Sequence, residues 1–500
     1  MHRTSSLMFL GTGSDVGKSV TATAFCRILK QNGLRVAPFK AQNMSNNSFV
    51  TVEGGEIGRA QAAQAEACGL PPSVHMNPVL LKPNSDLGSQ VVMQGAVLGN
   101  FSAAGYYALK PKLKEAVQES FRLLEEQYDA IIMEGAGSCA EINLRDHDIV
   151  NFEMALMTRS PVVLVADIDR GGVFAQIIGT LNVIAPRERD LVAGFLINKF
   201  RGDPCLFQSG IDYIEQSTGK PVFGLVPVYT GFSIDTEDSM SLDAAAAVKP
   251  PRPDKINIAV VRLPHVSNFT DLAALAREGS VLLNWLEQPV ALEPYDLLVI
   301  PGSKNTLNDM AWLEKTGWCA AIREFAAPGR NMVIGLCGGF QMLGREILDP
   351  HAVESNRPRV NGIGLLDVFT RMEKTKIVRL STGTDRLFST RVRGYEIHMG
   401  QTERGGAAEA FLDLDSGAEG ASNREGNVFG TYLHGLFDSA GFRARLLESL
   451  ASRKGLAVTP NLRREDFWLE KERHYDLLAE HFRQFVDTGA ILRIMRNSSR

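Results

Sequence analysis

Residues 7–19 read LMFLGTGSDVGKS, and this stretch decides the fold of the first half of the chain. Residues 7–10 are apolar and predict a short strand, and residues 19–31 have the spacing of a helix. The glycines between them let backbone N–H groups face an anion. The lysine adds a positive charge, and the serine adds a hydroxyl that can bind Mg²⁺. The stretch predicts an ATP-binding phosphate loop (P-loop) whose contacts are Gly11, Thr12, Gly13, Gly17, Lys18 and Ser19.

The P-loop interpretation depends on the order of elements as well as on residue types. Thr12 stands where the common motif has a glycine, and Gly11 lies one residue earlier. The alternative is a glycine-rich turn with an incidental Gly-Lys-Ser. Strand, loop and helix follow in the required order, which favours nucleotide binding. Glu134 ends another apolar run, which is the usual place for a carboxylate that binds Mg²⁺.

Short apolar strands and helical stretches alternate along the whole chain. Further strand-like runs before the middle of the chain are 35–38, 130–133, 162–166 and 192–197, and residues 111–128 have helical spacing. This alternation indicates βαβ units around a mostly parallel sheet. After a proline-rich segment the pattern restarts, with strands expected at 256–262, 297–300 and 332–336.

We therefore predict an α/β fold with two doubly wound domains. The expected units are a nucleotide-binding domain over 1–241, a linker over 242–254, a second α/β domain over 255–445 and a helical extension over 446–500.

Composition and charge exclude several classes of protein. A length of 500 residues exceeds one hydrophobic core, and a charged fraction of 22% is ordinary for globular domains. The net charge of −4 gives no overall positive field, which argues against nucleic acid as a partner. The apolar runs are too short to span a membrane, and the first residues do not resemble a signal peptide, so we expect a cytoplasmic protein. Six cysteines without CxxC spacing argue against a zinc site and a disulfide framework, and a homo-oligomer stays open.

Residues 333–344 read VIGLCGGFQMLG and predict a catalytic cysteine. Gly-x-Cys-x-Gly between a strand and a helix is typical of a nucleophile elbow, whose sharp turn needs small neighbours. A helix N-terminus at Cys337 would favour the thiolate. The alternative is a buried cysteine in a glycine-rich turn. His434, within FGTYLHGLF at 429–437, is the predicted base.

The P-loop segment, in the form GT-x-x-x-VGK-S, resembles that of dethiobiotin synthetase and its relatives, which use ATP to activate a carboxylate or carbamate. The resemblance implies that Lys40 and Glu134, within EGAG at 134–137, complete the ATP site, with Ser19 and Glu134 holding Mg²⁺. It also implies that Asn198, in INKFR at 197–201, reads the adenine base. Lys40 as a solvated surface lysine and Asn198 as a strand-end cap are the alternatives.

The cysteine segment resembles class I glutamine amidotransferases, in which a histidine about 100 residues later pairs with the cysteine. The loop IPGSK at 300–304 matches their glycine loop, which implies an oxyanion hole at Gly302 and Gly338. These enzymes carry His-x-Glu, but this chain has His434-Gly435-Leu436. We expect either a weaker dyad or a substitute carboxylate such as Glu396 or Asp438. His398 is a candidate for substrate binding or for a structural role.

The two halves together resemble the glutamine-dependent cobyrinic acid amidating enzymes, in which a dethiobiotin-synthetase-like domain is fused to an amidotransferase domain. This resemblance covers essentially the whole chain. It is most specific in three segments, residues 37–65, 77–83 and 166–174. It implies that L-glutamine, ATP and Mg²⁺ convert carboxylates b, d, e and g of adenosylcobyrinic acid a,c-diamide to amides, in cobalamin biosynthesis. The corrinoid would arrive already metallated. Candidate substrate contacts are Asn43, Ser45, Asn47 and Asp146, in polar loops at strand ends.

Two rival functions stay open at this point. A cobyrinic acid a,c-diamide synthase shares both domains and acts on carboxylates a and c. A partition-type ATPase switch would bind partners without making a product, but it leaves Cys337 and His434 unexplained.

Overall fold

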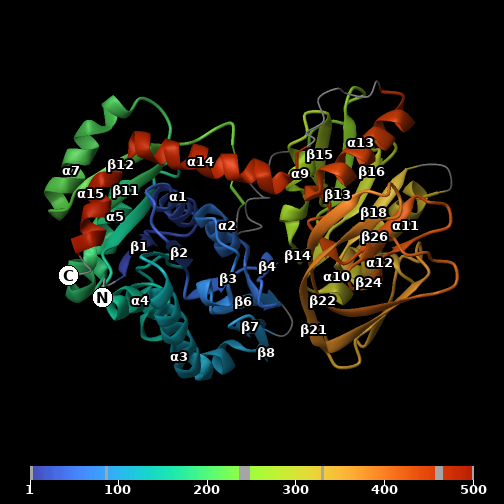
Figure 1. Ribbon diagram of the computed structural model, residues 1–500, viewed down its shortest axis with the longest axis horizontal. Helices are drawn as coiled ribbons and strands as arrows, with labels where there is room; N and C mark the ends of the chain where they lie inside the picture. Colours follow the sequence, from blue (N-terminus) through green and yellow to red (C-terminus); the bar gives the residue numbers. More distant parts are fainter. Residues whose placement is uncertain are drawn as a thin grey trace.

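Figure 1 shows a computed structural model of the chain, in which the two halves of the sequence form two lobes. The structure describes residues 4–84, 88–232, 234–235, 248–327, 331–456 and 465–497. Residues 242–247 of the expected linker lie outside the described residues. No helix in the described ranges is long and apolar enough to cross a membrane.

A six-stranded parallel sheet forms the first lobe. Its strand order is β12-β11-β10-β1-β9-β2, where the strands span Val222–Pro227, Val192–Phe200, Val162–Asp167, Ser5–Gly11, Ala130–Glu134 and Val36–Phe39. The chain passes from β1 to the edge strand β2 and later extends the sheet on the other side from β10. This reversal of direction places the P-loop, which follows β1, where open α/β sheets bind ligands.

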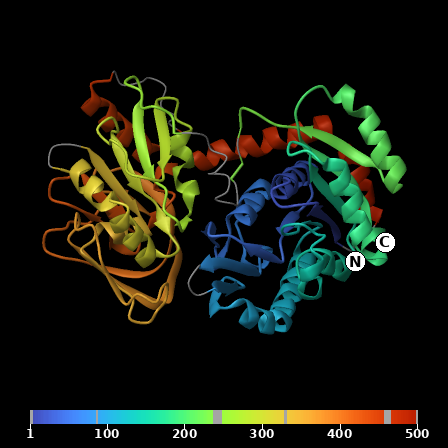
Figure 2. The ribbon, with the colours of Figure 1, turned by 180° about the vertical axis from the view of Figure 1, so that it is seen from behind.

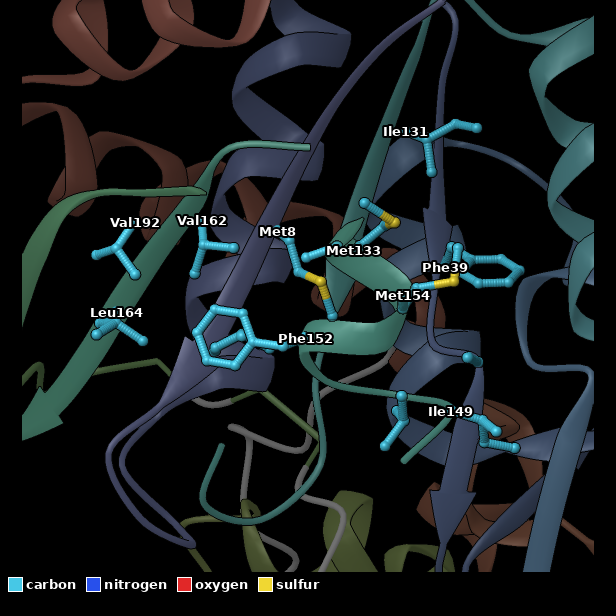
Figure 3. Packing of buried hydrophobic residues seen from close by; sticks show 14 of the residues in the cluster. Met8, Phe39, Ile131, Met133, Ile149, Phe152, Met154, Val162, Leu164 and Val192 are labelled. Atoms are coloured by element: carbon cyan, nitrogen blue, oxygen red, sulfur yellow. The ribbon is translucent and has the colours of Figure 1, made fainter. Parts of the chain in front are cut away.

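Helices cover both faces of this sheet and create two cores. On one face α3 (Ala103–Gln127), α4 (Phe152–Thr158) and α5 (Val173–Val183) pack on the strands. Figure 3 shows Met8 of β1, Met133 of β9 and Phe152 of α4 in this core. On the other face lie α1 (Lys18–Gln31) and α2 (Arg59–Cys68).

Helix α3 begins earlier than the sequence predicts. The expected start at Pro111 is wrong, because the helix begins at Ala103 and the Ser102 side chain accepts a hydrogen bond from the Gly105 N–H (3.3 Å). Proline at 111 therefore lies inside the helix and gives it no backbone donor there. The early cap matters for the site, because the first turns of α3 line a large cavity.

A small four-stranded sheet lies on the side of the first lobe that faces the second lobe (Figure 1). Its order is β3-β6-β7-β8, with bounds Gln42–Met44, Val79–Asn84, Gly88–Met93 and Ala96–Phe101. Strands β6 and β7 are antiparallel. We call them the β6–β7 hairpin.

The second lobe contains a sheet of order β15-β13-β16-β18-β26-β25. These strands span Val281–Leu286, Ile256–Val261, Leu297–Ile300, Met332–Leu336, Val428–Thr431 and Ala421–Ser422. All its pairs except β25·β26 are parallel, as the alternating pattern predicts. A second sheet is built on the antiparallel strands β21 (Val368–Asp385) and β22 (Arg391–Arg404), and β27 (Leu433–His434) pairs with β22.

The C-terminal helices return to the first lobe. After α13 (Ala440–Lys454), helix α14 (Phe467–Phe485) crosses from the second lobe to the first, and α15 (Thr488–Asn497) follows (Figures 1 and 2). Phe482 of α14 packs edge-on against Phe25 of α1, and Arg27 of α1 forms an ion pair with Asp476 (2.7 Å). The tail thus joins the core on the α1 face of this sheet, although Leu469 of α14 is 48% exposed.

Candidate active sites

Cys337 occupies a strained turn between β18 and α12 (Gly338–Leu343). Its φ of 49° and ψ of −106° lie where residues other than glycine rarely occur. A Cβ atom at Gly338 would lie 2.8 Å from the Ser303 backbone nitrogen, and one at Gly339 would lie 2.0 Å from the Ile300 carbonyl oxygen. The turn therefore needs glycine at both positions, where it packs against the loop that follows β16, and the Cys337 thiol donates to the Ile397 carbonyl oxygen (3.6 Å).

His434 lies in β27 and is fully buried between Asp271 and an aromatic ring. Its Nδ1 lies 2.7 Å from Asp271 Oδ2, and Asp271 Oδ1 accepts a hydrogen bond from the Gly435 N–H (2.9 Å). The Tyr395 ring stacks on the imidazole, with 5.2 Å between the two ring centroids. Burial opposes the charged imidazolium, but Asp271 and then Cys337 favour it and raise the pKa of His434 to about 10. The arrangement is a Cys337–His434–Asp271 triad with the geometry of nucleophilic catalysis.

A small cavity of about 40 Å³ lies beside Cys337 and His434. Cys337, His434 and Gly338 line it, together with Ser303. Gly302 packs behind, where a Cβ atom would lie 3.0 Å from Ser267 Oγ and 3.6 Å from His434 Cε1. The oxyanion hole expected at Gly302 and Gly338 stays a prediction, and Ser303 is a neighbour that the sequence did not single out.

The P-loop closes around its own lysine. Lys18 Nζ donates to the carbonyl oxygens of Gly13 (3.0 Å) and Gly137 (2.8 Å), so the side chain bends over the loop. Gly137 belongs to the EGAG turn after β9. The loop and this turn thus form one cradle at the carboxyl ends of neighbouring parallel strands β1 and β9.

Glu134 is the buried hub of the P-loop site. Its Oε1 accepts hydrogen bonds from Ser19 Oγ (2.7 Å) and Lys40 Nζ (3.1 Å), and its Oε2 accepts one from Gln64 Nε2 (2.7 Å). Burial opposes ionisation, but Lys40, followed by the Ser19 and Gln64 hydrogen bonds, holds the pKa of Glu134 below its usual value. Lys40 is buried here and is not a solvated surface lysine.

The Asn198 side chain supports the P-loop. Its Nδ2 donates to the Val16 carbonyl oxygen (2.9 Å), and a Cβ atom at Gly17 would lie 1.9 Å from this nitrogen. The next residue, Lys199, contacts Asp167 (3.0 Å) and Asp15 (3.3 Å). The reading of adenine by Asn198 stays a prediction.

A large cavity of about 830 Å³ extends from the P-loop. Ser14 and Gly137 line it beside the nucleotide cradle, and Tyr106, Tyr107 and Lys110 line it from α3. Burial lowers the pKa of the Lys110 ammonium to about 8. Most of the remaining lining comes from the small sheet and from residues 136–152.

The β6–β7 hairpin separates the large cavity from the small one. Side chains alternate between the faces of a strand. Leu81 and Pro83 of β6 line the large cavity, whereas Lys82 between them lines the cavity of Cys337. On β7, Ser89 lines the large cavity, and Gln90 Oε1 accepts a hydrogen bond from Lys304 of the second lobe (3.1 Å). The two sites therefore lie on opposite faces of one hairpin.

Two family models and many curated proteins match this chain. Residues 7–241 match the CobQ/CobB/MinD/ParA nucleotide binding domain, and residues 257–442 match the CobB/CobQ-like glutamine amidotransferase domain. A cobyric acid synthase of Syntrophobacter fumaroxidans is 46% identical over 512 residues, with 99% of each chain covered. The chain belongs to the cobyric acid synthase family. The cobyric acid synthase of Photorhabdus laumondii is 47% identical, with 98% of each chain covered, and that of Salmonella choleraesuis is 47% identical, with 99% of each chain covered.

Membership of the cobyric acid synthase family confirms the resemblance drawn from the sequence. The chain is a glutamine-dependent amidotransferase and ligase of cobalamin biosynthesis, and its nucleotide-binding domain implies the use of ATP. The α/β class with a parallel-sheet P-loop domain and an amidotransferase domain is also confirmed.

The orienting carboxylate was not found from the sequence. Glu396 instead binds Arg379 (2.7 Å) and Ser381 (2.5 Å), and burial raises the pKa of Asp438 to about 7. In the described ranges the carboxylate hydrogen-bonded to His434 is Asp271, so a carboxylate does substitute for the missing glutamate, but the two named candidates, Glu396 and Asp438, and the weaker dyad are wrong. Asp271 lies in a short 3₁₀ helix, Phe269–Leu272, far from His434 in sequence. The only sign of this role in the sequence is that Asp271 is an acidic residue in the loop after the strand expected at 256–262.

The four candidate substrate residues do not line the large cavity. Asn43 alternates with Gln42 and Met44 on β3, and it is these two neighbours that line the cavity. Asn43 donates to Gln61 Oε1 (2.9 Å), and Ser45 Oγ accepts from the Asn47 N–H (3.0 Å). Asp146 is exposed between the cavity residues Arg145 and His147.

Asp271→Asn is expected to reduce glutamine-dependent activity by about 10²- to 10⁴-fold. The amide would no longer stabilise the imidazolium or orient the ring for Cys337. Steady-state glutamate release measures the loss. The matched control is Glu396→Gln, which removes a buried carboxylate outside the triad. An equal loss in both variants, with both folded, would contradict the assignment of Asp271.

Proposed function

We propose that this chain uses L-glutamine and ATP with Mg²⁺ to convert carboxylates b, d, e and g of adenosylcobyrinic acid a,c-diamide to primary amides. The observation that carries the proposal is the placement of a Cys337 triad and a P-loop cavity on opposite faces of the β6–β7 hairpin. One site can release ammonia and the other can activate a carboxylate. Because only the β6–β7 hairpin lies between them, ammonia from the Cys337 site can supply the P-loop site.

The glutaminase half-reaction follows from the triad. The Cys337 thiolate attacks the side-chain amide carbon of glutamine, the C–N bond breaks, and ammonia leaves with a proton from His434. A thioester remains on Cys337. Water, deprotonated by His434, then hydrolyses the thioester and releases glutamate. Asp271 keeps the imidazole oriented and stabilises its charge through both steps.

The P-loop half-reaction makes a carboxylate reactive. Ser19 and Glu134 place oxygen atoms 2.7 Å apart at the loop, and this hard-oxygen chemistry suits Mg²⁺. When bound, the ion would neutralise charge on the ATP phosphates. Lys18 would stabilise the charge on the γ-phosphoryl group as it passes to a substrate carboxylate. Ammonia then attacks the acyl phosphate carbon, and phosphate leaves.

The large cavity supports a corrinoid as acceptor. Its volume of about 830 Å³ is in the upper range of small-molecule sites. The aromatic rings of Tyr106, Tyr107 and Phe101 line it and would lie beside an extended apolar ligand, and Lys110 and Arg145, which is paired with Glu188 (2.7 Å), bring positive charge near its carboxylates. We propose these residues as acceptor contacts in place of Asn43, Ser45 and Asn47.

Mass spectrometry of the products tests the proposed acceptor. We expect four new amides on adenosylcobyrinic acid a,c-diamide when glutamine and ATP are supplied. Inertness toward this substrate, with amidation of cobyrinic acid at carboxylates a and c, would contradict the proposal and favour an a,c-diamide synthase. ATP hydrolysis without any glutaminase activity would favour a nucleotide switch. The cytoplasmic location stays a prediction.

A further inference from the structure

The cavity of Cys337 carries more charge than its catalytic triad requires. Besides Cys337 and His434, its lining includes three lysines and one glutamate: Lys82, Lys304, Lys376 and Glu354. Lys82 and Lys376 share the buried carboxylate of Glu56, at 2.6 and 2.5 Å. Both of these lysines therefore already have a carboxylate partner, in a cluster that joins the two lobes.

Lys304 and Glu354 favour each other's charged form, but no direct ion pair joins them within the described residues. Lys304 is 8% exposed and bonds the neutral amide oxygen of Gln90, and no direct ion pair involves it in the described part of the chain. Glu354 is 7% exposed and its Oε2 accepts the Thr306 N–H (2.8 Å). Burial, followed by repulsion from Lys376 and Lys82, lowers the pKa of Lys304 to about 7, and burial raises the pKa of Glu354. Each group would gain from an added opposite charge.

We propose that Lys304 binds the α-carboxylate of glutamine and Glu354 binds its α-ammonium group, which rests on the proposed glutaminase site. A zwitterion supplies one counter-charge to each of these groups in one step. The side-chain amide of the same ligand would reach Cys337, which lines the same cavity. Both interactions would form away from water, where charge-assisted hydrogen bonds are strong.

Binding in this way would change the contact between the lobes. The cavity of about 40 Å³ holds a few water molecules at most, so glutamine enters only if a lining side chain moves. Lys304 would exchange Gln90 Oε1 for the ligand carboxylate. Gln90 belongs to the β6–β7 hairpin, whose other face lines the large cavity. Occupation of the glutaminase site would thus loosen the wall through which ammonia must pass.

The experiment compares three amide substrates by ammonia release: L-glutamine, glutaramate without the α-ammonium group, and 4-aminobutanamide without the carboxylate. Lys304→Met should lower kcat/KM about 10- to 100-fold for L-glutamine and glutaramate, but little for 4-aminobutanamide. Glu354→Gln should lower it similarly for L-glutamine and 4-aminobutanamide, but little for glutaramate. The matched control Lys374→Met changes an exposed lysine on the same strand as Lys376 and should behave as the parent.

The crossed pattern separates recognition from folding, because a misfolded variant would lose all three substrates alike. Lys304→Gln replaces Lys304→Met if the latter fails to fold. Equal losses for all three substrates in folded variants, or an unchanged kcat/KM for L-glutamine, would overturn the proposal. Ammonia release reports only on the glutaminase site. The crossed pattern would therefore be seen even if the proposed corrinoid acceptor were wrong. If the pattern were absent while amide products formed normally, only the roles of Lys304 and Glu354 would be refuted.

Discussion

Cys337→Ser is expected to lower glutamine-dependent amidation by about 10³-fold or more, because an alcohol is a far poorer nucleophile than a thiolate at neutral pH. The elbow turn should survive, since serine is similar in size and the strained backbone at 337 is held by its glycine neighbours. Supplied ammonium salts should restore amidation, because the P-loop site lies on the other side of the β6–β7 hairpin. Product formation is measured with each nitrogen source.

The control for this variant is Cys205→Ser, which changes an exposed thiol far from the elbow and should behave as the parent. Loss of both the glutamine- and the ammonia-dependent reactions in folded Cys337→Ser would contradict two separate sites. Full glutamine-dependent activity would remove Cys337 from the mechanism.

Lys18→Ala is expected to reduce amidation by at least about 10²- to 10³-fold with either nitrogen source. The variant removes the charge that would stabilise the transferring phosphoryl group. Glutamate release at Cys337 can continue, uncoupled from product. A paired assay of ADP and glutamate on one folded preparation measures both sites together.

Lys30→Ala in the last turn of the same helix is the matched control, because Lys30 contacts Glu472 (3.9 Å) at the opposite end from the P-loop. It should leave ADP and glutamate release near the parental rates. Near-normal ADP formation by Lys18→Ala in the presence of the corrinoid would place the nucleotide elsewhere.

The sequence predicts those parts of the sites that are built from local segments. The P-loop, the EGAG turn and the cysteine elbow each join one strand to the next turn, so their residue types and spacing report their geometry. Asp271 could not be found in this way, because its contact with His434 joins two loops that only the folded lobe brings together. Likewise, the Ser102 cap overrides the helix start that Pro111 indicates.

The arrangement of the lobes lies beyond local patterns. Apolar spacing predicts that the C-terminal tail is helical, but not that α14 and α15 complete the core beside β1 and α1. The alternation of side chains on β6 predicts two faces but not what each face lines. The structure shows that Lys82 lines the cavity of Cys337, whereas Leu81 and Pro83 line the large cavity. The same alternation on β3 turns Asn43, one of the polar residues expected to hold substrate, away from the large cavity, which is lined by its neighbours Gln42 and Met44 instead.

The central claim is that ammonia released at Cys337 crosses the β6–β7 hairpin to a carboxylate in the large cavity. Glutamine labelled with ¹⁵N in its side-chain amide, supplied with ATP and an excess of unlabelled ammonium, tests this claim most directly. Mass spectrometry then gives the fraction of label in the new amides. Our account predicts a fraction of glutamine label in the new amides far above that of the bulk ammonium, because nitrogen released at Cys337 reaches the carboxylate without mixing with the solvent. Label diluted to the composition of the bulk ammonium would contradict it.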